Sequence, residues 1–330
     1  MKYYLIQENY NTNGKLVGGP IRITGDSIDK QWIKQRMDAA FNRMLLDCRN
    51  QIKPGSIRIA DMECSLELPG GKYVLKIVEA KPAYSSEDVL MGLVVKYKGE
   101  WSQIFSAINK REPILDELDS LLWGVHGYIT LINEKYPLSL KSVPQPPFAL
   151  FYKNNIDLLS DRYVHLAVLA DDNTPACLLK KTAEDVTNLP GRVAIVTNDL
   201  ALIKKIKSIQ PNRKIIMVKD CGLDCNTEDH RLLNENDLII TEVPHGNKTT
   251  KDRQKRASRI IAGIASHLLI ANFQEKSTIC LAVTFGLYCG REILVYPTLP
   301  EWRNLQNNKL ISEGAELVEN ANDITALMAL

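Results

Sequence analysis

The chain has 330 residues, of which 45% are hydrophobic and 24% charged, and its formal net charge is +2 at pH 7. This composition excludes long disordered tracts and is typical of a folded protein with two domains. The small net charge excludes a polycation that binds nucleic acid with its whole surface, so a nucleic-acid site must be a local basic patch.

Cysteine usage and hydropathy indicate the compartment. The seven cysteines are scattered, odd in number and not preceded by a signal peptide. The longest uncharged stretch, from Ser277 to Gly290, is shorter than the roughly 18 to 20 residues that span a bilayer. We therefore expect a cytoplasmic protein in a reducing environment, without a membrane segment.

Residues 1–85 are expected to form a small α+β unit, whose role the sequence does not indicate. A helix is predicted from Ser27 to about Arg49, with Asp26 or Ser27 as its N-cap. Two strands are predicted on either side of a turn at Pro69 to Gly71. The expected buried stripe of the helix consists of Ile33, Met37, Ala40, Phe41, Met44 and Leu45.

Residues 86–135 are expected to be a mainly helical bridge, and residues 136–330 a Rossmann-like domain. In the latter, short apolar runs alternate with longer mixed segments, which predicts a mostly parallel sheet flanked by helices. The expected strands are Tyr163–Ala170, Arg192–Thr197, Lys214–Val218, Asp237–Thr241, His267–Asn272 and Glu292–Tyr296. The expected helices include Asp199–Ile209, Asp252–Ser266, Ser277–Tyr288 and Leu305–Gly314.

A basic run lies on one of these helices. Between Lys248 and Arg259, six of twelve residues are basic and one is acidic. Such a run by itself more often marks a solvated helix face than a binding site. The 3.6-residue repeat is expected to turn Ala257, Ile260, Ile261 and Ile264 inward, and Lys255, Arg259 and Ser266 outward with Arg256 at the edge.

Six motifs follow one another through the C-terminal two thirds of the chain. They are YPLSLKSVPQPPFALFYKNNIDLL (136–159), GLD (222–224), ITEVPHG (240–246), RASRIIAGIAS (256–266), QEKSTICLAVTFGLYCGREILVYP (274–297) and NLQNNKLISEGAELVENANDI (304–324). The fourth is the most specific. In this order they resemble the Rossmann-like domain of the DNA-processing protein A (DprA or Smf) family.

The resemblance implies a protein that binds single-stranded DNA without a cofactor and passes it to a RecA-type recombinase. It also implies a homodimer formed through the last helices and strands, where the tail ENANDITALMAL offers leucines and a methionine. No winged-helix module is expected after the Rossmann-like domain. Catalytic activity is not required by this interpretation.

The phosphate-binding loops of the family are only partly matched. The loops Leu169–Pro175 and Val196–Ile203 lack the expected glycines, and the first carries two acids. Because glycine lets backbone N–H groups approach a phosphate, this half of the anion site is expected to be lost. The residues expected to contact nucleic acid or phosphate are Lys251, Arg253, Lys255, Arg256, Arg259, Gly263, Asn272, Lys276, Ser277 and Thr278.

Two alternative functions remain open. The same cleft can serve a sensor that binds a small nucleotide. A nuclease is the other alternative, because Asp61, Glu79 and Lys81 resemble the metal-binding and catalytic positions of PD-(D/E)xK nucleases. No metal site is expected, since the set Cys221, Cys225, His230 and His245 has an unusual spacing for zinc.

Overall fold

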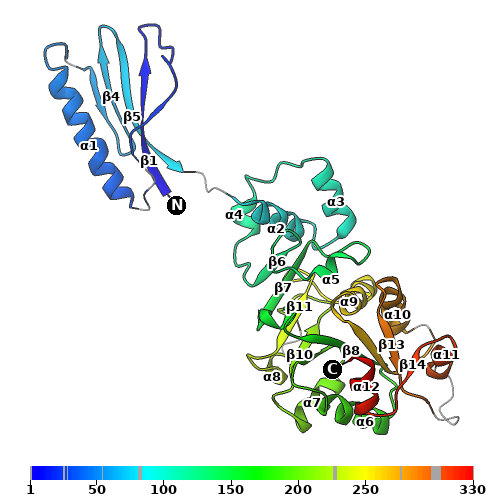
Figure 1. The fold of residues 1–330 in the computed structure, drawn as a ribbon. Helices are drawn as coiled ribbons and strands as arrows, with labels where there is room; N and C mark the ends of the chain where they lie inside the picture. The colour runs from blue at the N-terminus through cyan, green and yellow to red at the C-terminus, as the bar shows by residue number, and fades with distance from the viewer. Residues whose placement is uncertain are drawn as a thin grey trace. The chain divides into compact units, whose positions relative to one another are not determined.

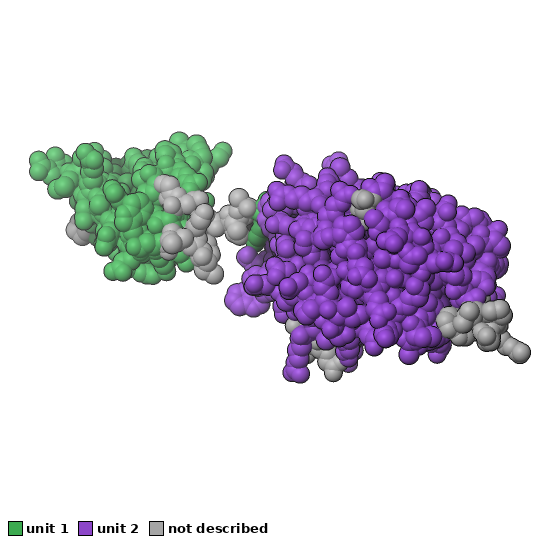
Figure 2. All heavy atoms as spheres, turned by 60° about the horizontal axis from the view of Figure 1, so that its bottom comes forward, with its two compact units in different colours: residues 1–84 green, residues 85–330 purple. Residues whose placement is uncertain are grey.

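The computed structural model describes residues 2–24, 27, 29–53, 55–80, 84–225, 229–275, 277–298 and 306–329. The chain divides into two compact units, Met1–Tyr84 and Ser85–Leu330, which are coloured separately in Figure 2.

The first unit is a five-stranded antiparallel sheet with the order β2-β1-β5-β4-β3 and one helix, α1, packed on it (Figure 1). Ile33, Met37 and Phe41 of α1 meet Leu5, Leu66 and Leu75 of the sheet in one apolar cluster. The expected apolar stripe of the helix is therefore confirmed. The elements are β1 (Lys2–Tyr10), β2 (Ile21–Arg22), α1 (Lys30–Asp47), β3 (Ile57–Ile59), β4 (Glu63–Leu68) and β5 (Gly71–Ala80).

The expected N-cap of α1 is wrong. Asp29 caps the helix, because its carboxylate accepts hydrogen bonds from the N–H groups of Gln31 and Trp32. Ser27 instead pairs with Tyr3 of β1 as an isolated β-bridge, and Asp26 lies outside the described residues. Pairing with the sheet thus delays the start of the helix.

The second unit begins with short helices. Ser85 and Asp88 form a capping box that starts α2 (Ser86–Lys96). The chain continues through α3 (Trp101–Asn109) and α4 (Leu118–Leu121) to β6 (Tyr128–Thr130), which pairs with β7 (Ala149–Asn154) at one edge of the main sheet. Helix α5 (Leu138–Lys141) lies between these two strands in the sequence.

The main sheet has nine strands in the order β14-β13-β12-β8-β9-β10-β11-β7-β6. Strands β8 to β14 pair in parallel, whereas β7 and β6 are antiparallel. The six strands expected from the sequence are β8 to β13. They span Val164–Ala170, Val193–Thr197, Ile215–Val218, Leu238–Thr241, His267–Asn272 and Glu292–Val295, and are followed by β14 (Glu316–Leu317).

Helices cover both faces of this sheet (Figure 1). Apolar residues of α9 and α10, such as Ile260, Ile261 and Ile279, join alternate residues of the strands in the largest core cluster. The Rossmann-like α/β fold is therefore confirmed. The remaining helices are α6 (Ala176–Thr187), which has no counterpart among the expected helices, α7 (Leu200–Ile209), α8 (Asp229–Leu232), α9 (Lys251–Ile264), α10 (Thr278–Tyr288), α11 (Asn307–Ser312) and α12 (Ala321–Leu327).

Within the described residues, no helix has both the length and the hydropathy required to cross a bilayer. Met328 at the C-cap of α12, expected to be exposed, is buried, with 6% of its surface accessible.

Candidate nucleic-acid interface

A cleft opens at the carboxyl ends of the parallel strands, beside the reversal of strand order. Strand β8 lies between β12 and β9, and such a reversal is where open α/β sheets bind ligands. The cleft encloses about 660 Å³. Its walls are the ends of β8, β9 and β10, one face of α9, and the first turn of α10.

Carboxylates dominate the charge of the cleft. Asp171 and Asp172 follow β8, Asp199 follows β9, and Asp220 follows β10. Lys219 is the one cation among the described residues that line the cleft, and its Nζ donates to a backbone carbonyl oxygen. A phosphate entering this space therefore meets mainly negative charge.

Asp199 is held in the cleft as the N-cap of α7. Its Oδ1 accepts hydrogen bonds from the N–H groups of Ala201 and Leu202, at 2.7 and 3.1 Å. Burial raises the pKa of Asp199 and the carboxylate of Asp172 raises it further, although the two hydrogen bonds act in the opposite direction. The helix end that a phosphate could occupy is thus already satisfied by a carboxylate.

Asn272, expected to contact phosphate, is fully buried at the end of β12. Its Oδ1 accepts from the hydroxyl of Thr174 and from the N–H of Asp171. The side chain therefore joins the loop after β8 to β12, and its burial leaves none of its surface open to a ligand in this structure.

The amino end of α10 forms the other side of the cleft mouth. Ser277 caps this helix by accepting a hydrogen bond from the N–H of Ile279, as expected, and Thr278 is exposed. The first turn carries no acidic residue, so its positive dipole end is not neutralised there. Lys276, expected in the same site, lies outside the described residues.

Two lysines of α9 stand beside this helix end. The hydroxyl of Ser258 lies 3.4 Å from the carbonyl oxygen of Thr278, which places α10's first turn against α9. Lys255 and Lys251 precede Ser258 by three and seven residues, so they lie on the same side of α9, one and two turns nearer its start. Both are exposed. We call Lys251, Lys255, Ser277 and Thr278 the basic rim.

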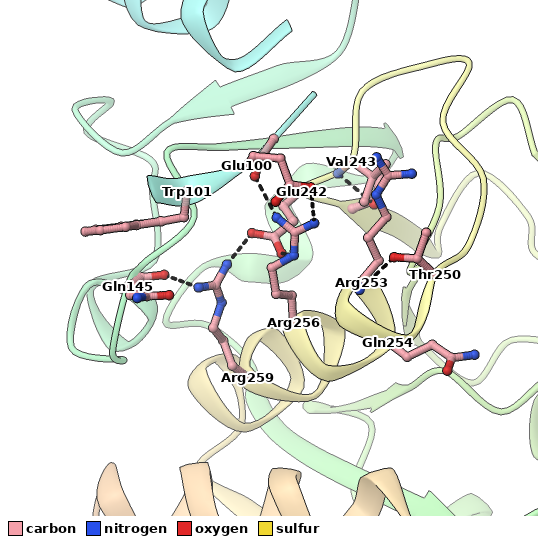
Figure 3. Close-up of polar contacts among 12 residues, drawn as sticks. Glu100, Trp101, Gln145, Glu242, Val243, Thr250, Arg253, Gln254, Arg256 and Arg259 are labelled. Carbon is pink, nitrogen blue, oxygen red and sulfur yellow. Dashed lines mark hydrogen bonds and ion pairs between the residues drawn. The ribbon is translucent and has the colours of Figure 1, made fainter. Parts of the chain in front are cut away.

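The arginines of α9 do not belong to the rim. Arg253 and Arg259 are buried, and Arg256 is mostly so, although Arg259 was expected on the solvent face. Arg253 donates to the carbonyl oxygen of Lys248 and to the side chain of Asn247. The side chains of these arginines therefore contact other groups of the protein (Figure 3). The expectation that they form a basic surface is wrong.

Arg256 and Arg259 face inward because of Glu242, a buried acid just after β11. Its Oε2 accepts a hydrogen bond from Arg259 Nη2, and its Oε1 lies 3.5 Å from Arg256 Nε. Arg256 also donates to the carbonyl oxygen of Gly99 at 2.8 Å and to Glu100 at 3.0 Å. Complete burial raises the pKa of Glu242, and the two guanidinium groups oppose this rise.

The sequence analysis did not predict this network, although its residues belong to motifs that had been identified. Glu242 belongs to the motif ITEVPHG, and Arg256 and Arg259 begin the motif RASRIIAGIAS. An acid at the end of a buried strand needs a buried cation as a partner. This requirement for a buried cation was the signal in the sequence that could have indicated that Arg256 and Arg259 face inward.

Gly263 serves packing rather than ligand approach. A Cβ at this position would lie 2.6 Å from Cδ1 of Leu140 and 2.6 Å from Cγ1 of Val143. Helix α9 therefore approaches α5 closely because residue 263 has no side chain. These packing contacts account for the glycine without a ligand.

The nuclease residues of the first unit are not brought together by any described contact. Asp61 is exposed and forms ion pairs with Lys34 at 2.5 Å and Lys30 at 3.6 Å. Lys81 and the side chain of Glu79 lie outside the described part of the chain. Within that part, no group of three or more His, Cys, Asp or Glu residues could hold a metal ion.

The fold and the site together define a Rossmann-like α/β protein with a cleft at the carboxyl ends of its strands. The sequence profile of the DNA recombination-mediator protein A family matches residues 205–329. Over these residues the chain is therefore similar to the DNA-processing protein A (DprA/Smf) family.

Individual relatives agree with this assignment. DNA processing protein DprA of Streptococcus pneumoniae is 24% identical over 206 residues, which is 60% of this chain and 72% of the relative. DprA of Bacillus subtilis is 25% identical over 209 residues, covering 59% and 69% of the two chains.

Two solved structures share the fold. DprA from Streptococcus pneumoniae has a TM-score of 0.59 at 22% identity and covers 74% of this chain and 94% of its own. DNA processing protein A from Helicobacter pylori, which binds single-stranded DNA, has a TM-score of 0.53 at 20% identity and covers 62% and 97%.

Proposed function

We propose that this protein binds single-stranded DNA, as a DNA-processing protein of its family, and that the DNA backbone lies on the basic rim. The observation that supports the location is the proximity of exposed Lys251 and Lys255 to the amino end of α10, whose first turn carries no acidic residue. Lysines and helix amino ends are both common phosphate contacts in nucleic-acid complexes. The similarity to the DNA recombination-mediator protein A family and to the Helicobacter pylori protein, which binds single-stranded DNA, supports the class of ligand.

The rim is favoured over the interior of the cleft because of charge. Asp171, Asp172, Asp199 and Asp220 lie inside, whereas the lysines lie outside on α9. A phosphodiester held at the mouth gains the attraction of the lysines and keeps its distance from the carboxylates. The backbone therefore crosses the mouth rather than entering it.

Pairing of two copies is part of the proposal. Leu287 and Tyr288 at the end of α10 are 63% and 69% exposed, and Leu317 in the edge strand β14 is 46% exposed. Exposed apolar side chains at the end of a helix and on an edge strand suit an isologous contact. Light scattering at micromolar concentration tests it, and Leu287→Asp with Leu317→Asp should yield a monomer. A wild-type protein that is monomeric under these conditions would refute the dimer.

Delivery of the bound strand to a RecA-type recombinase completes the proposal. It predicts that the protein speeds the loading of recombinase onto single-stranded DNA already coated by a single-strand-binding protein. Unchanged loading in its presence would refute this step while leaving DNA binding intact.

The test of DNA binding is fluorescence anisotropy with a labelled oligothymidylate, with and without Mg²⁺. We expect binding that weakens steeply with salt, is indifferent to Mg²⁺ and leaves the oligonucleotide uncut. Cutting that requires Mg²⁺ would favour the nuclease. Absence of binding at low salt would refute the proposed function.

A further inference from the structure

Three aromatic rings are stacked at the start of α3. The ring of Trp101 lies 4.8 Å from that of Phe105 with 14° between their planes, and 5.4 Å from that of Phe148 with 24° between them. Phe105 follows Trp101 by four residues, so both belong to one face of α3. Phe105 is 46% exposed, which leaves aromatic surface of the stack open to solvent.

The stack is fixed by polar contacts on both sides. Trp101 Nε1 donates to the carbonyl oxygen of Pro146 at 3.1 Å. Arg256 holds the carbonyl oxygen of Gly99 and the carboxylate of Glu100, just before Trp101. Arg259 donates to the carbonyl oxygen of Gln145, three residues before Phe148. Figure 3 shows these arginines reaching from α9 to both segments.

This rigidity suits a binding surface. Rings that are immobilised before binding lose little conformational entropy when a ligand stacks on them. Burying charged groups costs free energy, and here the buried arginines hold the two chain segments that carry the rings. An aromatic cluster that served only as a core would place Phe105 inside.

The charge along α9 identifies the occupant. Lys251, Lys255 and Arg259 follow one another at intervals of four residues and so form one stripe along the helix. The two lysines of this stripe are exposed and can meet phosphates, whereas Arg259 is buried. Arg259 links the stripe to the loop of the ring stack, because it donates a hydrogen bond to the carbonyl oxygen of Gln145. Cations followed by exposed aromatic surface are the two components of single-strand binding sites, where phosphates meet the cations and bases stack on the rings.

We propose that Phe105, supported by Trp101 and Phe148, is a stacking platform for the bases of single-stranded nucleic acid whose backbone lies on the lysine stripe. The inference rests on the proposed function and extends the binding site from the cleft mouth to α3. The platform contacts the flat faces of bases, so it selects for unpaired strands and against duplex DNA, whose bases are already stacked.

The test compares Phe105→Ala with Ile108→Ala, a matched control one turn later on α3 that is 39% exposed and lies outside the stack. Circular dichroism first establishes that both variants fold. Phe105→Ala should weaken oligothymidylate binding about 5- to 100-fold, the range expected for one lost base stack. Ile108→Ala should leave it within twofold, and Phe105→Tyr should retain most of it.

An abasic oligonucleotide of the same length separates stacking from charge. The wild type and Phe105→Ala should bind it equally, because it offers phosphates and no bases. The salt slope on the normal oligonucleotide should be the same for both proteins, since stacking releases no counterions.

The outcomes distinguish the two proposals. If the wild type binds single-stranded DNA and Phe105→Ala binds it equally well, the platform is refuted and the proposed function stands. If the wild type does not bind at all, both are refuted. If Phe105→Ala changes the oligomeric state measured by light scattering and not the affinity, Phe105 belongs to a contact between copies and the platform is refuted.

Discussion

Arg259 and Glu242 form an ion pair in which both side chains are buried, with 2% and 5% of their surfaces exposed. The arginine projects from α9 and the acid follows β11, so the pair joins the helix to the sheet. Two further contacts, from Arg256 to Glu100 and from Arg259 to Gln145, extend it to α3 and to the loop before β7.

Glu242→Ala should destabilise the protein by about 3–5 kcal/mol, because it leaves two buried guanidinium groups without their carboxylate. Urea unfolding followed by circular dichroism measures the loss. Glu184→Ala is the matched control, since its pair with Lys180 is exposed on α6 and is worth at most about 0.5 kcal/mol. A loss below 1 kcal/mol for Glu242→Ala would contradict the structural role.

Charge changes on α9 should distinguish the DNA-binding role of its lysines from the structural role of its arginines. Lys251→Gln with Lys255→Gln should leave the protein folded, weaken single-stranded DNA binding and reduce the salt slope by about 1.4, or roughly 0.7 for each lost contact. Lys180→Gln with Lys309→Gln, two exposed lysines outside the cleft lining, should change neither.

Reversal of the two arginines should instead unfold the protein. Arg256→Glu with Arg259→Glu puts two acids beside Glu242 and Glu100, so we expect loss of the cooperative unfolding transition. A folded double variant that merely lost DNA binding would restore the arginines to the binding site and contradict the network.

Asp172→Asn should strengthen single-stranded DNA binding about twofold at low salt. Removing one charge roughly 8 Å from a phosphate in water relieves about 0.5 kcal/mol of repulsion, and salt screens the effect. Affinity is measured at two salt concentrations, with Glu313→Gln, at the C-cap of α11, as the control. Weaker binding by Asp172→Asn would indicate that the cleft carboxylates contact the ligand favourably.

Asp199 predicts a pH dependence of stability. Because its pKa is raised above the ordinary value of 3.8, the folded state binds the proton more tightly than the unfolded state. The free energy of unfolding therefore falls as the pH rises from 3.8 through the raised value. Asp199→Asn keeps the helix cap and abolishes this titration.

The measurement is urea unfolding of the wild type and Asp199→Asn at several pH values. The stability of the Asn variant relative to the wild type should increase across that interval and then remain constant. Asp199→Ala, which loses the cap, should be about 1 kcal/mol less stable than Asp199→Asn at pH 7. A relative stability of the Asn variant that falls with pH would contradict the raised pKa.

Gly263→Ala should cost about 1–3 kcal/mol, since the added methyl group displaces Leu140 and Val143. The folded variant should bind single-stranded DNA like the wild type. Combining it with Leu140→Ala should recover part of the stability. A loss of affinity without a loss of stability would place the glycine next to the ligand.

The sheet could be predicted from the sequence because its strands are continuous apolar runs. Val193–Thr197 and Leu238–Thr241 are buried throughout, and such runs between longer mixed segments indicate a parallel sheet. The first unit was harder to predict. Its edge strands Ile21–Arg22 and Ile57–Ile59 are short and exposed, so they lack the alternation that marks a half-buried strand.

The site could be predicted only in part because the sequence does not show which groups a polar side chain contacts in the folded protein. Ser277 was identifiable as a cap from its position before an apolar helix. Arg259 and Asn272 were assigned to a ligand because their actual partners are not neighbours in the sequence. Glu242 lies 17 residues from Arg259, and Thr174 lies 98 residues from Asn272. Local periodicity places a residue on a face of a helix, and only the tertiary fold decides whether that face is exposed to solvent.

The arginine contacts also set an order of events during synthesis. Arg256 binds Glu100 across 156 residues of sequence, and Arg259 binds Gln145 across 114. At ordinary rates of translation, on the order of 10 s pass between the emergence of α3 and that of the helix that fastens it. Until then the aromatic rings of α3 and the loop at Gln145 lack their anchor. The docking of α9 is therefore the step that completes the anchoring of α3 and of the loop at Gln145.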